Sequence, residues 1–151
     1  RRIGCERKEG ISMEYRKFGD KYVVRLDKGE EIVYSLLKLC AWKDIKVAQV
    51  TGIGAVGEVT AGLFDTEKKE FISHTWTGDM EITALTGNIT TKEQKPYEHL
   101  HITVAGRDGM ARGGHLKRAV VSATAELFLT AADGTVEREM SDEIGLNLMK
   151  F

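Results

Sequence analysis

Three of the four histidines fall within a stretch of 17 residues, and their spacing suits the binding of a metal ion. His99 and His101 form an H-x-H pair in a strand-like run, and side chains two residues apart on a strand point to the same face. Gly113 and Gly114 stand directly before His115, so the backbone can turn tightly there and return a third imidazole to the pair. Three imidazoles suit Zn²⁺, Ni²⁺, Fe²⁺ or Co²⁺, and three protein ligands leave one coordination position for water or a substrate.

The same three residues also have a simpler interpretation. Two histidines on one strand face are often solvated or hydrogen-bonded to backbone carbonyls, and an H-x-H pair alone is a weak motif. The spacing therefore leaves both interpretations open. The fourth histidine, His74, is isolated in the sequence, and we interpret it as structural.

The elements that must position these histidines are strands, together with one helix. From Ile32 the apolar residues recur at helical spacing as far as Trp42, with Asp27 as the expected cap. Glycines at 52, 54 and 57 match the dinucleotide fingerprint G-x-G-x-x-G, but strand-like residues follow them, which favours bends or bulges in a sheet. Strands are expected at 22–26, 47–51, 58–64, 70–77, 80–86, 99–105, 120–129 and 136–140, with turns such as 78–79 between them. One helix among hairpin-linked strands predicts an α+β domain with a largely antiparallel sheet.

Composition narrows the classes of protein that this chain can represent. Hydrophobic residues make up 42% of the chain and charged residues 30%, as in a globular protein. The net charge of -1 gives no strong overall attraction to nucleic acid or to an anionic membrane. No apolar run is long enough to span a membrane, and no apolar segment near the start indicates a secretory signal. With two cysteines, Cys5 and Cys40, we expect a reducing cytoplasm. Residues 1–12 are interpreted as a flexible lead-in to a single domain over residues 13–151.

Five sequence features, in order along the chain, resemble the Plants and Prokaryotes Conserved (PPC) domain family. They are YVVRL with the following GEE at 22–31, GIGAV at 52–56, EITALTGNI at 81–89, HLH at 99–101 and GGHL at 113–116. The resemblance implies an α+β fold around an antiparallel sheet, a homotrimer, and similarity to the acetolactate decarboxylase fold. In that fold three histidines hold zinc. The resemblance thus implies a divalent metal, preferably zinc, on His99, His101 and His115, near a subunit boundary.

Several charged residues are further candidates for the site. Glu81 is a candidate fourth ligand or general base, and a surface carboxylate is its alternative. Glu98 and Glu126 are weaker candidates, and Glu126 would need an arginine partner if it faced inward. The basic residues Arg107, Arg112 and Lys117 are candidate contacts for a ligand or anion, with a solvated loop as the alternative.

Two classes of function follow from these observations. The first is a metal-bearing homotrimer that binds a small molecule or acts on one, with lyase or hydrolase chemistry suggested by fold analogy alone. The second is a DNA-associated regulator, because plant members of the resembled family carry AT-hook motifs. This chain contains no Arg-Gly-Arg-Pro tetrapeptide, so its residues favour the first class.

Overall fold

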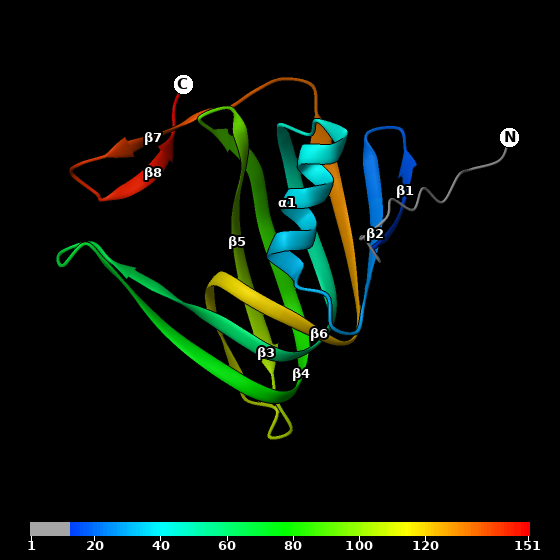
Figure 1. Cartoon of the computed structure of the whole chain (residues 1–151). Coiled ribbons are helices and arrows are strands. Elements are labelled where there is room, and N and C mark those ends of the chain that lie inside the picture. The colour runs from blue at the N-terminus through cyan, green and yellow to red at the C-terminus, as the bar shows by residue number, and fades with distance from the viewer. Residues whose placement is uncertain (1–12) are drawn as a thin grey trace, which may run out of the picture.

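The computed structural model describes residues 13–151 as a twisted antiparallel sheet with one helix packed on its face (Figure 1). The predicted lead-in at 1–12 lies outside these residues. The elements in chain order are β1 (Glu14–Phe18), β2 (Lys21–Asp27), α1 (Ile32–Lys43), β3 (Val47–Asp65), β4 (Glu70–Lys92), β5 (Lys95–Ala105), β6 (Ala111–Ala132), β7 (Arg138–Ser141) and β8 (Leu146–Met149). This architecture confirms the predicted α+β class. Among the described residues, no helix is long and apolar enough to cross a membrane.

The strands are longer than the sequence pattern predicts. A turn was expected at Gly78-Asp79, but β4 passes through both residues and runs for 23 residues. Gly78 takes a φ of +109°, which glycine adopts without strain, so the strand bends there and does not end. The glycines of β3 behave as predicted, since the register between β3 and β4 shifts between Gly52 and Gly54.

Strand β6 ties the sheet together by pairing with three other strands. The strand order is β1-β2-β6-β3-β4-β5, and the first part of β6 also pairs with β5. The pairing runs from His101 opposite His115 to Ala105 opposite Ala111. Strands β3, β4, β5 and β6 therefore close into a ring, and this closure brings the two histidine-bearing strands side by side.

Helix α1 begins at a cap that the sequence pattern did not identify. Asp27 was expected as the cap, but Glu31 holds that place, with Oε1 accepting from the amide of Val33 and Oε2 from that of Tyr34. The same carboxylate accepts from the amide of Ala119 on β6, 2.9 Å away. Its longer side chain thus joins the helix to the sheet, whereas Asp27 pairs with Arg25.

Glu31→Ala is expected to lower the free energy of unfolding by about 2 kcal/mol, because three backbone amides lose a charged acceptor. Urea denaturation measures the change. Glu67→Ala is the control: Glu67 is exposed in the turn between β3 and β4, so its replacement should change stability by less than about 0.5 kcal/mol. Equal stabilities of the two variants would contradict the assigned cap.

Cys40 lies fully buried on α1, and burial raises the pKa of its thiol to about 12. A Cys5→Ser variant is therefore expected to resist a thiol-specific disulfide reagent at pH 8 while folded, because the thiol of Cys40 is not ionised at that pH and the reagent cannot reach it. After unfolding in guanidinium it should yield one reactive thiol per chain. Rapid stoichiometric labelling of the folded variant would contradict the burial of this side chain.

Two hairpins project on the same side of the molecule (Figure 1). The end of β3 and the start of β4 form a long hairpin, and β7 with β8 forms a short one. Their tips are in contact, because Lys69 Nζ donates to the backbone carbonyl of Asp142. A Cβ on Gly145 would lie 3.2 Å from the ring of Phe64.

Candidate metal centre

The structure brings the three predicted histidines together. His99 and His101 lie on β5, and His115 lies on β6 directly opposite His101. One ligand nitrogen from each of the three imidazoles lies within 4.8 Å of the other two. The ring centres are 5.1 Å apart for His99 and His101, 5.3 Å for His99 and His115, and 5.8 Å for His101 and His115. We refer to these three residues as the histidine triad.

Glycine is required before His115 because the strands approach closely there. A Cβ on Gly113 would lie 1.9 Å from the backbone oxygen of Ile102. A Cβ on Gly114 would lie 2.4 Å from the backbone oxygen of Gly62, on the other side of β6. The close approach of the backbone agrees with the prediction, but the chain does not turn there: the two glycines let β6 continue between β5 and β3, and so place the third imidazole.

The surroundings of the triad favour the neutral form of two of its imidazoles, those of His99 and His115. Burial lowers the pKa of His115 to about 4, with smaller contributions from the charges of His99, Lys117 and His101. Burial also lowers the pKa of His99, assisted by the charges of His101 and Arg138. A neutral imidazole has the lone pair that a divalent cation needs, and no carboxylate belongs to the cluster within the described part of the chain. This donor set fits zinc, with three nitrogens and a position left open.

The predicted basic contacts divide between two places. Lys117 lies near the triad: its Nζ is 4.4 Å from the ring centre of Phe71, and that ring is 5.5 Å from the ring of His115. Arg107 and Arg112 line a separate pocket of about 310 Å³, and no triad histidine lines it.

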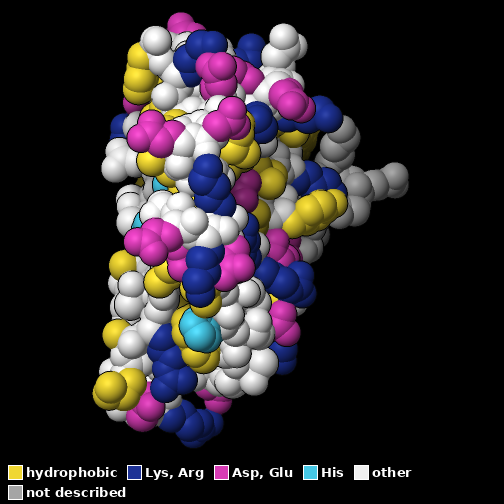
Figure 2. Space-filling model, turned by 90° about the vertical axis from the view of Figure 1, so that its left-hand side faces the viewer, with side chains coloured by type: hydrophobic (Ala, Val, Ile, Leu, Met, Phe, Trp, Pro, Cys, Tyr) yellow, Lys and Arg dark blue, Asp and Glu magenta, His cyan; other side chains and the backbone are white. Residues whose placement is uncertain are grey.

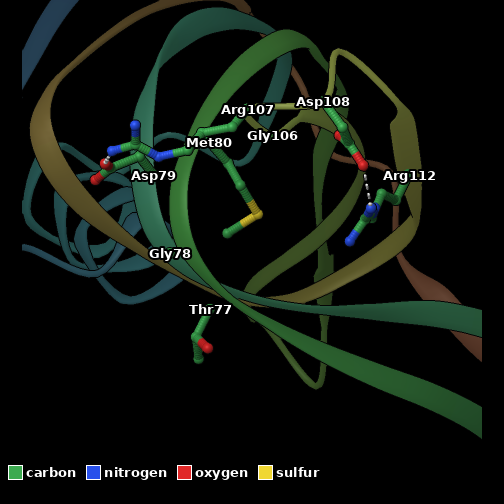
Figure 3. Close-up of a pocket in the computed structure, with 8 residues that line it drawn as sticks. All are labelled: Thr77, Gly78, Asp79, Met80, Gly106, Arg107, Asp108 and Arg112. Carbon is green, nitrogen blue, oxygen red and sulfur yellow. Dashed lines mark hydrogen bonds and ion pairs between the residues drawn. The ribbon is translucent and has the colours of Figure 1, made fainter.

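Figure 3 shows that the two arginines lie on opposite sides of this second pocket, with Met80 between them. Arg107 pairs with Asp79 at 2.8 Å, and Arg112 pairs with Asp108 at 3.2 Å. Because each guanidinium already has a carboxylate beside it, the pocket presents two cations and two anions in balance. A role for Arg107 and Arg112 as anion contacts stays a prediction.

Two of the predicted carboxylates, Glu81 and Glu126, lie apart from the triad within one chain, whereas Glu98 directly precedes His99 and pairs with Ile89 on the other face of the sheet. Glu81 is exposed inside β4 opposite Ala105, four residues along β5 from His101, or roughly 13 Å at the rise of a strand. Its role as a ligand or base stays a prediction. Glu126 is exposed on β6 opposite Arg25 and so needs no buried partner. Glu98 is half-buried, and burial is the main cause of its raised pKa.

The sequence pattern missed two residues beside the triad. Asn88 on β4 is the register partner of His99, and cross-strand partners share one face of a sheet. Arg138 on β7 donates from Nη2 to Asn88 Oδ1 at 3.0 Å. A signal was present for Asn88, which stands inside EITALTGNI, one of the family-like segments. No motif marked Arg138.

The solved structures most useful for comparison come from bacteria and archaea. A protein of Bacteroides thetaiotaomicron, provisionally named DNA-binding, is 36% identical, with a TM-score of 0.90 and coverage of 92% of this chain and 97% of that one. A metal-containing protein of Archaeoglobus fulgidus is 33% identical, with a TM-score of 0.81 and coverage of 89% and 96%. A plant- and prokaryote-conserved protein of Pyrococcus horikoshii is 29% identical, with a TM-score of 0.82 and coverage of 96% and 98%.

Curated proteins provide no match to this chain. The family model of the Plants and Prokaryotes Conserved domain matches residues 13–133, which is most of the chain. The match begins just before β1 and ends in the loop after β6, so it includes the whole six-stranded sheet, the helix and the triad. This chain therefore belongs to the Plants and Prokaryotes Conserved domain family.

Proposed function

We propose that this protein holds one divalent metal ion, zinc, on His99, His101 and His115, and binds a small molecule at the coordination position left open. The observation that carries the proposal is the approach of three imidazole nitrogens to within 4.8 Å of one another. The metal-containing relative from Archaeoglobus fulgidus supports it. The similarity of the fold to acetolactate decarboxylase, which the sequence resemblance implies, also supports it.

The residues around such a metal site have different roles. The triad supplies nitrogen ligands, and the ring of Phe71 makes a T-shaped contact with that of His115. Lys117 adds a positive charge nearby, which favours an anionic ligand. A bound zinc ion would polarise a carbonyl or lower the pKa of a water molecule. Lyase or hydrolase chemistry is the corresponding reaction class, and it rests on fold analogy.

Elemental analysis of the purified protein tests the metal. We expect about one zinc per chain in the wild type and less than a tenth of that in His101→Ala, because two ligands rarely retain a zinc ion. His74→Ala is the matched control: His74 is exposed and stacks on Trp76 at 5.9 Å, outside the triad. Zinc content that is the same in the wild type and both variants would defeat the site.

We also propose that the chain forms a homotrimer. The face of the sheet opposite α1 exposes Phe18, Ile53 and Phe128, whose side chains are 50%, 57% and 48% accessible. A pocket of about 590 Å³ lies beside two of them. Exposed apolar side chains of this kind are typical of surfaces that bind a partner. Light scattering should give three times the chain mass of 16.8 kDa, and a mass of one chain would contradict the trimer.

DNA binding is the second candidate, supported by the provisional name of the Bacteroides relative. Figure 2 shows Lys and Arg side chains lying among Asp and Glu side chains on the face turned to the viewer. A mixed face of this kind gives less attraction to phosphates than a basic patch would. A gel shift at about 150 mM salt should show no specific complex. Specific retention that is lost in Arg112→Ala or Lys117→Ala would favour DNA over the small molecule.

A further inference from the structure

Arg138 carries a buried positive charge that forms no ion pair with any carboxylate of residues 13–151. The residue is 7% exposed, and its three hydrogen bonds all go to neutral acceptors. Nε donates to Thr90 Oγ1 at 2.6 Å, Nη1 to the carbonyl of Asn147 at 3.0 Å, and Nη2 to Asn88 Oδ1 at 3.0 Å. The ion pairs of the described residues do not include it. The carboxylate of Glu98 acts on this charge from a distance, without an ion pair. A buried charge without a directly bound counter-ion is costly, so the guanidinium is suited to bind an anion.

This guanidinium lies on the same face of the sheet as the triad. Its acceptors Asn88 and Thr90 are the register partners of His99 and Tyr97 on β5. The guanidinium carbon is 5.0 Å from the centre of the Tyr97 ring. The short hairpin of β7 and β8 brings it there, beside β4 and β5 (Figure 1). Arg138 therefore contacts Asn88, the residue directly across the sheet from His99.

Both the guanidinium and a neighbouring amide retain unused bonding capacity. A guanidinium has five N–H groups, and three of those of Arg138 are used, which leaves one on each terminal nitrogen. Two terminal N–H groups can hold a carboxylate. Asn147 donates from Nδ2 to the hydroxyl of Tyr97 at 3.4 Å, while its Oδ1 is buried without a hydrogen-bond partner. A hydroxyl on a ligand would supply the donor that this oxygen lacks.

We propose that Arg138 binds the carboxylate of a small hydroxycarboxylic acid, whose other end places an oxygen ligand on the metal of the triad. This inference rests on the proposed metal centre and adds the chemical class of the ligand. Arg138 lies beyond residue 133, where the match to the family model ends, so the C-terminal hairpin supplies the recognition and the family domain supplies the metal. Lys117, on the other side of the triad, adds to the attraction for an anion.

Calorimetry on the zinc-loaded protein tests this role with two probes. Malate carries the carboxylates and the hydroxyl, whereas acetohydroxamate binds zinc without a carboxylate. In Arg138→Gln we expect the affinity for malate to fall at least tenfold, since a charged, forked contact is lost. The affinity for acetohydroxamate and the zinc content should stay unchanged.

Arg138→Lys provides a second variant if the glutamine variant unfolds, because lysine retains the charge and loses only the paired N–H groups of the guanidinium. Its affinity for malate should also fall, and its affinity for acetohydroxamate should again stay unchanged. Equal losses for both probes would show that Arg138 only maintains the fold, and an unchanged malate affinity would show that it binds no carboxylate; either result overturns the inference while zinc stays bound. A wild-type protein without zinc would instead overturn the metal centre and the inference together.

Discussion

Removal of zinc by a chelator is expected to lower the melting temperature of the protein by about 10 °C. A ligand present at 1,000 times its dissociation constant stabilises the folded state by about 4 kcal/mol. For a domain of this size each kcal/mol corresponds to roughly 2–4 °C. The triad exists only in the folded chain, because His99 and His101 meet His115 through the pairing of β5 with β6. Scanning calorimetry with and without the chelator measures the shift.

The triad variants separate this effect from a general influence of the chelator. His101→Ala should melt at the same temperature in both conditions, because its site no longer holds the ion. His74→Ala should keep the full shift, since its imidazole lies outside the triad. If the chelator lowered the melting temperature of the wild type and of His101→Ala by the same amount, the stabilising metal would not be bound by the triad.

Gly113→Ala is expected to destabilise the protein by about 3 kcal/mol or more, at the upper end of what an overpacked position costs. The added Cβ would lie 1.9 Å from the backbone oxygen of Ile102 and 2.9 Å from the carbonyl carbon of the same residue. Backbone atoms cannot rotate out of the way, so β6 must move away from β5. We expect the variant to lose zinc as well, because the same pairing holds His115 in the triad.

Gly57→Ala on β3 is the matched control for that substitution. A Cβ on Gly57 has Ser122 as its nearest neighbour, at an ordinary contact distance of 3.5 Å. Its replacement should therefore change the free energy of unfolding by less than about 1 kcal/mol. Urea denaturation of both variants gives the comparison, and a Gly113→Ala protein as stable as Gly57→Ala would contradict the close approach of β5 and β6.

The H-x-H pair could be predicted from the sequence because its information is local, whereas the spacing left metal binding open and the family resemblance implied His115 as the third ligand. An H-x-H pair on a strand shares a face whatever the rest of the fold does. The glycine pair before His115 indicated a close backbone approach, and the structure places Ile102 and Gly62 at that approach. The one helix was predicted within a residue of its end for the same reason, since its apolar spacing is a local pattern.

The remaining site residues depend on contacts that are distant in the sequence. Arg138 reaches Asn88 across 50 residues, and no spacing rule connects a short C-terminal strand to the middle of β4. The basic residues at 107, 112 and 117 seemed one cluster in the sequence. In the register of β5 and β6, Arg112 lies opposite Val104, whose side chain faces the core, whereas His115 lies opposite His101 on the other face. The structure therefore separates Arg112 from the triad.

The three-way pairing of β6 also determines when the chain can fold. Residues 21–27 of β2 pair with residues 124–130 of β6, so the first hairpin has no neighbour in the sheet until β6 has left the ribosome, about 100 residues later. Pairings over such separations are slow to form, because loop closure must come first. The N-terminal strands of a nascent chain therefore wait with an open edge, and the time before β6 arrives is when this protein is most exposed to aggregation and to chaperones.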